Sequence, residues 1–269
     1  MSGSILNNVS ALNASRQLGI TGQGLQKAIE RLTSGKRINR AADDAAGLAI
    51  ANRLDADIRI AGQGRRNAND GISYLQVADG VLGEVTNLLT RAAELAQQAA
   101  SGTSGADNGT GKTAINAEFK NIVKTMADIE SNTTFNGASV FNALSALAVA
   151  VGGFTPVSVS VGTFTSLSTS DTLATSAGAI STASKITIAL DAVSALRGSI
   201  GAGEQQLTSL SNSLGIQVEN FTAAFSQIKD ANIADEVVAL NKFQVLNQSG
   251  ISALSQANQA NQSILKLLQ

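Results

Sequence analysis

The chain contains no cysteine, no histidine and no tryptophan. Without a thiol or an imidazole it cannot form a disulfide, a Ser-His-Asp or Cys-His catalytic group, or a zinc site built from Cys and His ligands. It also has one proline, one tyrosine and only 3% aromatic residues among its 269. These absences exclude most classes of enzyme, and we expect a protein with no catalytic site, no cofactor and no bound metal.

Charged side chains are scarce at both ends of the chain. Its 19 basic and 20 acidic residues nearly cancel, but Arg16 alone is ionisable in residues 1–26, and only Lys242 and Lys266 follow Glu236. The start has neither the basic segment nor the apolar run of a secretory signal, and no stretch approaches the ~18 apolar residues of a membrane span. We therefore expect no membrane contact.

Basic residues concentrate within residues 27–66, which carry nine of them against five acidic ones. A nucleic-acid surface would need such a cluster, but this stretch has no interleaved aromatic residue that could stack on bases. We expect these side chains to form ion pairs with a neighbouring subunit, and we expect no nucleic acid as a partner.

Apolar residues recur every three or four positions at both ends of the chain, which is typical of amphipathic helices. We expect a first helix that is interrupted by a flexible joint at residues 19–24 and that stops at Gly35. A very long helix should begin near Asp43 and Asp44, whose carboxylates suit a first turn, and run to about Ala100. Its expected inner stripe is Ala51, Leu54, Ile58, Ala61, Ala68, Ile72, Leu75, Ala78, Leu82, Val85, Leu89, Ala92 and Ala96.

The middle of the chain shows β patterns between further helices. A heptad-like helix is predicted over residues 115–129, and helical spacing returns at Leu190. Asn136-Gly137 predicts a hairpin turn, because both central residues of a type I′ turn need positive φ. Val157, Val159 and Val161 alternate with serines and predict a half-exposed strand. Half of residues 155–184 are Ser or Thr, so we expect exposed loop or edge strands there rather than core.

The segment from Gly105 to Thr113 has the composition of a phosphate-binding loop. Five residues separate Gly105 from Gly111 where that motif has four, and the preceding segment is helical rather than a strand. We therefore interpret it as a polar loop between helices, with Thr113 capping the next helix.

The last segment carries two adjacent stripes spaced by three and four, one through Val237 and Leu240 and the other through Phe243 and Leu246. One neighbouring helix covers one stripe, so pairing of the two chain ends leaves the other stripe without a partner. We therefore expect self-assembly through apolar residues of both ends. These residues are Ile5, Val9, Leu12, Leu25, Ile29, Leu32, Val237, Leu240, Phe243, Leu246, Ile251, Leu254, Ile264, Leu265 and Leu268.

Motifs at both ends resemble one known family. Residues 30–50 read ERLTSGKRINRAADDAAGLAI, similar to ERLSSGxRINSAxDDAAGxAI, and residues 66–73 read RNANDGIS, similar to RNAxDGIS. The C-terminal resemblance covers Asp230, Ala231, Glu236, Gln248, Gly250, Leu254, residues 256–259 and residues 267–268. The chain thus resembles the bacterial flagellins, the filament subunits of the flagellum.

This resemblance implies a mainly α fold: a long antiparallel, coiled-coil-like helical rod with a small β-hairpin region, in which the N- and C-terminal helices pair. It implies inner-tube helices over residues 1–40 and 231–269 and a helical rod domain over residues 41–142 and 185–230. A short β or loop variable region over residues 143–184 takes the place of large outer domains.

The resemblance also implies a function and partners. The function is self-polymerisation into an extracellular filament for motility, without enzymatic activity. The implied partners are copies of the chain itself, hook-associated and cap proteins, and an export chaperone on the C-terminal segment. Export is expected through the flagellar type III apparatus, without a cleaved signal peptide.

In the family, an innate immune receptor of the host recognises a patch on the rod helices. The matching positions here are Arg91, Glu94, Leu95 and Glu118, and packing between subunits is an alternative use for them. Ala93 stands where immunostimulatory relatives carry a second arginine.

Three other classes stay open at this level. A hook-associated junction protein shares the terminal pattern but typically has proline after the acidic pair, where this chain has Ala45-Ala46-Gly47. A secreted enzyme with a peptidase in the variable region would need a zinc site, which the absence of histidine disfavours. A non-polymerising coiled-coil adaptor would be expected to carry more charge beside its heptad positions.

Overall fold

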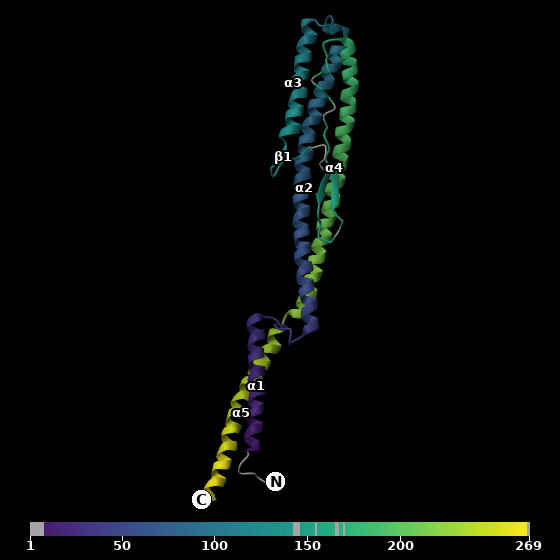
Figure 1. Cartoon of the computed structure of the whole chain (residues 1–269). Helices are drawn as coiled ribbons and strands as arrows, with labels where there is room; N and C mark the ends of the chain where they lie inside the picture. The colour runs from purple at the N-terminus through teal and green to yellow at the C-terminus, as the bar shows by residue number, and fades with distance from the viewer. Residues whose placement is uncertain (1–7, 142–145, 154, 165–166, 169, 268–269) are drawn as a thin grey trace. The chain divides into compact units, whose positions relative to one another are not determined.

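The computed structural model describes residues 8–141, 146–153, 155–164, 167–168 and 170–267, with the backbone alone for residues 146 and 260–267. The described chain is mainly helical, as expected (Figure 1). Its helices are α1 (Val9–Ser34), α2 (Ala45–Ala100), α3 (Thr110–Asn132), α4 (Ser176–Lys229) and α5 (Ile233–Leu267), with a short 3-10 helix η1 (Gly102–Ser104). The strands are β1 (Thr134–Phe135), β2 (Ala138–Ser139), β3 (Ala146–Val149) and β4 (Val157–Ser160). The chain divides into a terminal unit, residues 1–58 and 219–269, and a central unit, residues 59–218.

Helix α1 of the terminal unit pairs with α5, which confirms the expected pairing of the two chain ends. Asn8 caps α1 by accepting a hydrogen bond from the N–H of Ala11 at 3.0 Å. The helix stops at Gly35, as predicted, because this residue has φ 68° and its N–H bonds to the carbonyl of Arg31 at 2.8 Å.

The flexible joint predicted at residues 19–24 is wrong, because α1 runs through it without a break. A glycine in a helix costs roughly 1 kcal/mol relative to alanine, so another interaction must offset it. Packing supplies that interaction at Gly24, where a Cβ would lie only 2.5 Å from the ring of Phe243 on α5. The glycine is therefore a contact point between two helices rather than a hinge.

The segment between α1 and α2 is held by carboxylate caps. Asp44 accepts a hydrogen bond from the N–H of Gly47 at 2.8 Å and so caps α2, which confirms the helix start predicted from the acidic pair. Asp43 accepts the N–H groups of Arg40 and Asn39, at 3.1 and 3.3 Å. The N–H of Arg40 lowers the pKa of Asp43, because it stabilises the charged form.

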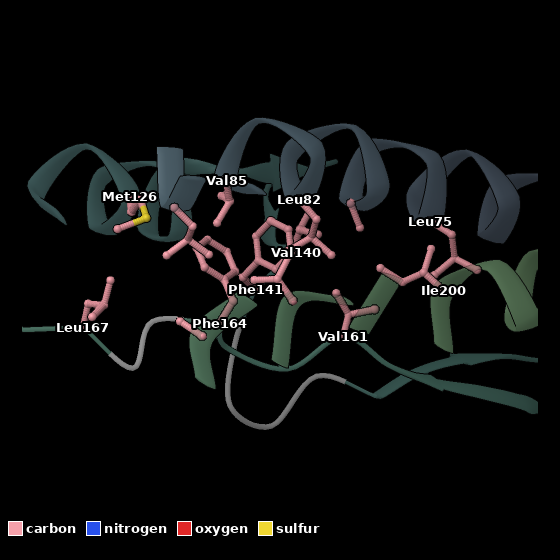
Figure 2. Close-up of a cluster of buried hydrophobic side chains, with 14 of the residues drawn as sticks. Leu75, Leu82, Val85, Met126, Val140, Phe141, Val161, Phe164, Leu167 and Ile200 are labelled. Atoms are coloured by element: carbon pink, nitrogen blue, oxygen red, sulfur yellow. The ribbon is translucent and has the colours of Figure 1, made fainter. Parts of the chain in front are cut away.

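The core of the central unit forms where α2, α3 and α4 pack together. The predicted stripe of α2 lies in this core from Ala61 to Ala96, with Ile72 partly buried. The predicted heptad of α3 is also confirmed, since Phe119, Ile122 and Met126 are buried, with Ile115 and Ile129 packed beside them. Figure 2 shows aromatic residues filling the space between the helices, with the rings of Phe141 and Phe164 5.1 Å apart, edge to face.

Two hairpins belong to the central unit. The turn at Asn136 and Gly137 has φ 49° and 79°, which confirms the type I′ signal, and it joins β1 to β2. Strand β4 buries Val157 and Val159 and exposes the serines between them, as predicted, and it pairs antiparallel with β3.

The expectation that residues 155–184 contribute no core is wrong. Val161, Leu173 and Ala179 are completely buried, and α4 already begins at Ser176, before the predicted return of helical spacing at Leu190. Serine and threonine dominate the composition of this stretch, but an apolar residue recurs every two to six positions. That spacing is enough to line one side of a chain that runs along the helices.

Glycines let the β3–β4 hairpin approach the helices closely. A Cβ on Gly64 of α2 would lie 2.6 Å from the backbone nitrogen of Gly152, in the loop between the two strands. A Cβ on Gly71 would lie 2.7 Å from the side chain of Val149, and Gly203 of α4 meets Val159 in the same way. Gly64 and Gly71 of α2 therefore form the surface on which the β3–β4 hairpin packs.

Lys112 connects three segments of the central unit. Its side chain is 1% exposed, and its ammonium group donates to Asp107 at 2.7 Å and to Ser176 at 2.6 Å. The bond from Lys112 and the N–H of Ser176 lower the pKa of Asp107. The lysine is thus committed to holding the loop against α4, consistent with a polar loop rather than a phosphate site. The predicted cap at Thr113 is wrong, because α3 already begins at Thr110 after Gly109.

Helix α4 contains an 18-residue window with a mean hydropathy of 1.3, so by length and composition it could cross a membrane. The expectation that no stretch approaches a membrane span is therefore wrong for the length and composition of α4. The inner face of the helix, including Ile186, Val193 and Ile200, belongs to the core of the central unit, and the helix also carries Lys185 and Arg197. We treat it as a core helix.

Candidate assembly surface

The contact between α1 and α5 uses one line of residues on each helix. On α1 a line of half-buried or buried positions recurs every three or four residues, at Ala11, Ala14, Leu18, Thr21, Leu25, Ala28 and Leu32, with Gly24 beside it. On α5 they are Glu236, Leu240, Phe243, Asn247, Gly250, Leu254 and Ala257. Each line has the four-three spacing of a coiled-coil seam, so this pair of helices packs as a heptad predicts.

The line on α5 draws members from both stripes predicted for it, so the assignment of one whole stripe to the partner helix is wrong. Leu240 and Leu254 come from one predicted stripe, and Phe243 and Gly250 from the other. Because the two stripes are adjacent on α5, helix α1 packs between them and contacts the nearest residues of each. The remaining apolar residues then lie beside the contact or, like Val238 and Val245, on the face of α5 opposite to it.

These flanking apolar residues stay exposed in the single chain. Val238 and Val245, one heptad apart on α5, are 67% and 66% exposed, and Val9 and Leu12 on α1 are each 61% exposed. The exposed large apolar residues of the two helices are Val9, Leu12, Ile20, Ile29, Ile233, Val237, Val238, Val245, Leu246 and Ile251. This set defines the apolar flank, a name kept below.

The structure divides the residues expected to drive self-assembly into three groups. Six are exposed and belong to the apolar flank: Val9, Leu12, Ile29, Val237, Leu246 and Ile251. Five are half-buried between the paired helices: Leu25, Leu32, Leu240, Phe243 and Leu254. The other four, Ile5, Ile264, Leu265 and Leu268, lie outside the residues whose side chains are described. One part of the expected set thus holds the helix pair together and another part faces outward.

The expected self-assembly set omits Ile20, Ile233, Val238 and Val245, which also belong to the apolar flank. The seven-residue separation of Val238 and Val245 is a signal that could have found them, since it repeats on one side of a coiled-coil helix. Val238 and Val245 fall on neither of the two stripes of α5, so the spacing of those stripes does not predict them.

Three basic side chains of the terminal unit form ion pairs within the chain. Arg31 on α1 donates to Glu236 on α5 at 3.2 Å, and Lys27 approaches Asp43 at 3.5 Å. Arg40 and Glu30 form a third pair at 3.0 Å. Within the single chain these three side chains have acidic partners of their own, and the expectation that this basic stretch pairs with a neighbouring subunit stays a prediction.

The chemistry of the apolar flank follows from what it lacks. Beyond Glu236, α5 carries two charged residues, Lys242 and Lys266, while aliphatic side chains recur along its exposed sides. Fully burying one Val, Leu or Ile side chain stabilises a complex by roughly 1.5–3 kcal/mol. A surface of this kind suits other apolar helices, and it offers no group for acid-base or nucleophilic chemistry. Among the described residues, no cluster of acidic side chains is placed to hold a metal ion.

Three of the four residues expected to form a receptor patch lie at the surface of the central unit. Arg91 on α2 bonds to Glu118 on α3 at 2.8 Å and to Glu94, one turn away, at 3.0 Å. Both carboxylates raise the pKa of Arg91, that of Glu118 more strongly. Leu95 is 1% exposed and packs in the core, so its place in a surface patch is corrected. The Leu95 side chain belongs to the hydrophobic core, whereas Arg91, Glu94 and Glu118 form their ion pairs at the surface.

Comparison with known proteins places these features in a family. Residues 5–146 match the bacterial flagellin N-terminal helical region, and residues 183–268 match the bacterial flagellin C-terminal helical region.

Two relatives illustrate how far the similarity extends. A flagellin of Halalkalibacterium halodurans is 37% identical, over 98% of this chain and 99% of that protein. Flagellin FlaB1 of Treponema pallidum is 34% identical, with the same coverage of both chains. A crystal structure of Bacillus cereus flagellin is 28% identical, with a TM-score of 0.47 over 60% of this chain and 94% of that one. The matches to both family regions and to full-length relatives show that this chain belongs to the bacterial flagellin family.

Proposed function

We propose that the chain is the structural subunit of a bacterial flagellar filament, an extracellular appendage for motility, which it builds by polymerising with copies of itself. Membership of the flagellin family supports this function. The observation that carries it at the residue level is the apolar flank, which α1 and α5 leave exposed outside their contact.

The driving force is the burial of the apolar flank between subunits. At about 25 cal/mol per Å² of apolar surface, burying on the order of 1000 Å² per subunit contributes roughly 25 kcal/mol before ordering entropy is subtracted. Since the apolar residues lie beside the contact and on the face of α5 opposite to it, one neighbour cannot cover them all. Several copies around each subunit can, and a repeating assembly provides them.

Within this filament we assign residues 1–40 and 231–269 to the inner tube and residues 41–142 and 185–230 to the rod. The pairing of α1 with α5 supports grouping the two ends together. Residues 143–184 form the short variable region, and because α4 begins at Ser176 the last part of this region is helical. We further propose that the chain has no enzymatic activity of its own.

The partners other than the chain itself belong to the same proposal. Hook-associated and cap proteins contact the subunits at the ends of the filament. An export chaperone binds the C-terminal segment, and the chain is then exported through the type III apparatus without cleavage of a signal peptide. The exposed aliphatic residues of α5 support the need for a chaperone, because an apolar surface of this kind aggregates when it is left uncovered.

A host innate receptor is a further proposed partner, through Arg91, Glu94 and Glu118. Their exposed ion-pair network supports this role, since it offers a rigid arginine between two carboxylates. Alanine at position 93 leaves this patch with a single arginine. Packing against neighbouring subunits is the competing use of the same side chains.

Removing residues 235–269 tests the proposed function. We expect the truncated chain to remain soluble and to form no filaments, whereas the full chain forms long ones under polymerising conditions, as judged by electron microscopy. Circular dichroism checks that the central unit of the truncated protein stays helical. Filaments from the truncated chain would refute the proposal, and short caps from the full chain would identify a hook-associated protein instead.

Point variants sharpen the same test without removing a helix. Replacing Val238 and Val245 by aspartate should abolish polymerisation, because charges on the apolar flank cannot be buried without a partner. The matched control, Val238→Ile with Val245→Ile, keeps both positions apolar and should still polymerise. Equal polymerisation of the two double variants would contradict the role of the apolar flank.

A further inference from the structure

A groove in the central unit remains outside the assembly surface described above. It has a volume of about 470 Å³ and lies between three elements. Its floor is the face of α2 at Asp70, Gly71 and Tyr74, one wall is the β1–β2 turn at Asn136, and the other wall is strand β3. The missing side chain of Gly71 lets β3 approach α2, so the groove is built by the same close packing that seats the hairpin.

Several polar groups of the groove are already committed. The hydroxyl of Tyr74 donates to the carbonyl of Val140 at 3.0 Å. Asn67 donates to the carbonyl of Ala150 at 2.9 Å and accepts from Gln63 at 2.8 Å. These bonds fix the walls of the groove.

The one charged side chain that lines the groove, Asp70, is a hydrogen-bond acceptor. Asp70 is exposed and forms no ion pair or hydrogen bond with any other described residue, and neither does the side chain of Asn136. In the part of the chain that the structure describes, β3 pairs with β4 alone, so its other edge presents backbone carbonyls together with N–H groups. An edge-to-face pair of Tyr74 and Phe135, with centroids 5.6 Å apart, lines the same space. A carboxylate, carbonyl oxygens and aromatic rings together suit a cationic side chain.

The chain itself carries cations that lack a partner. Lys120 and Lys124 are exposed, one turn apart on α3, and neither pairs with a carboxylate among the described residues. Three other cations of the central unit are engaged by carboxylates: Lys185 by Asp171, Arg197 by Asp79 and Arg91 by Glu118. Because no bond joins the two lysines to Asp70 within one chain, a second copy is the natural source of the ion pair.

We propose that the groove at Asp70 receives Lys120 and Lys124 from α3 of a second copy, an inference that rests on the proposed function. The two surfaces lie on different elements, so the contact is heterologous: the groove of one subunit takes the helix of the next. Contacts of this type propagate rather than close, and they generate open helical filaments. The apolar flank supplies most of the free energy, and this ion pair fixes how neighbouring central units register against each other.

Neutralising either partner tests the contact. We expect Asp70→Asn, and separately Lys120→Gln with Lys124→Gln, to raise the critical concentration for polymerisation about five- to tenfold at low salt. Combining all three changes should add little to either alone, because they remove one shared interaction. The matched control is Asp191→Asn on α4, an exposed carboxylate away from the groove, which should leave the critical concentration unchanged.

Exchanging the charges of Asp70 and the two lysines is the decisive experiment. Asp70→Lys should prevent polymerisation, and adding Lys120→Asp with Lys124→Asp should restore it in the same chain. Unchanged polymerisation of Asp70→Lys, or failure of the reversed chain to recover, overturns the contact. Failure of the unaltered chain to polymerise would instead refute the proposed function, so the two outcomes are distinguishable.

Discussion

The terminal and central units use the same spacing of apolar residues and reach opposite results. In the central unit the spacing produces a closed core, in which Leu75, Leu82 and Leu89 are at most 1% exposed. In the terminal unit the same spacing leaves the apolar flank open to solvent, and its buried apolar side chains among the described residues are Ala28, Ile38 and Ala51. The difference lies in the number of neighbours, since α2 packs in a core with two helices while α1 has one. Spacing specifies a helix face, and only the number of partners decides whether it is buried.

Truncating a large side chain should separate the two units most clearly. Phe119→Ala in the central core should lower the free energy of unfolding by about 3–5 kcal/mol, because it leaves a cavity. Leu12→Ala on the apolar flank should change it by less than about 0.5 kcal/mol in the unpolymerised chain. Chemical denaturation of both variants below the polymerisation threshold measures the difference. Similar losses for the two would mean that the flank is covered in the single chain.

Adding one methyl group tests the surface on which the β3–β4 hairpin packs. Gly64→Ala should destabilise the chain by about 1–3 kcal/mol, because its Cβ would meet the backbone of Gly152, which cannot move independently. Gly62→Ala, two residues away with nothing within 4 Å, should stabilise it by about 0.5–1 kcal/mol by favouring the helix. Thermal unfolding of the pair gives the sign, and a gain in both variants would argue against the close backbone contact.

Acid should weaken the central unit partly through Asp171. Burial raises the pKa of this carboxyl group. The bonds from Lys185 at 2.5 Å and from the N–H of Ser168 at 2.9 Å lower the pKa by more than burial raises it, so the net pKa lies below its ordinary value. The carboxylate therefore stabilises the fold above the unfolded pKa of about 4, and this stability is lost as the pH falls through the lowered folded pKa.

Asp171→Asn should cost about 1–2 kcal/mol at pH 7 and flatten the fall in Tm between pH 5 and pH 2, roughly the window in which the carboxylate titrates. A set of Tm measurements across that range checks the slope. Parallel curves for the variant and the unaltered chain would show that other carboxylates account for the acid sensitivity.

Much of the fold follows from local signals in the sequence. Gly35, Asp44 and the Asn136-Gly137 turn act through their own backbone or side-chain geometry, so each could be placed from the residues alone. The heptad of α3 needed only its period. The break expected at residues 19–24 failed because glycine was judged by its propensity, whereas its role depends on Phe243, more than two hundred residues away.

The candidate site was less accessible to the same reasoning. Which apolar positions of α5 face α1 depends on how one helix settles between two stripes, and this cannot be read from spacing. Leu95 was assigned to a surface by motif position, while the structure buries it with the rest of the α2 stripe. The free state of Asp70 was equally hidden, because it depends on which cations lie near it in space.

The burial of Lys112 makes this amine a chemical reporter for one end of the central unit. Acylating reagents should reach Lys112 only when its bonds to Asp107 and Ser176 open. Peptide mapping after timed labelling would therefore follow the loosening of that end inside an intact polymer, where the absence of cysteine leaves no native thiol to label.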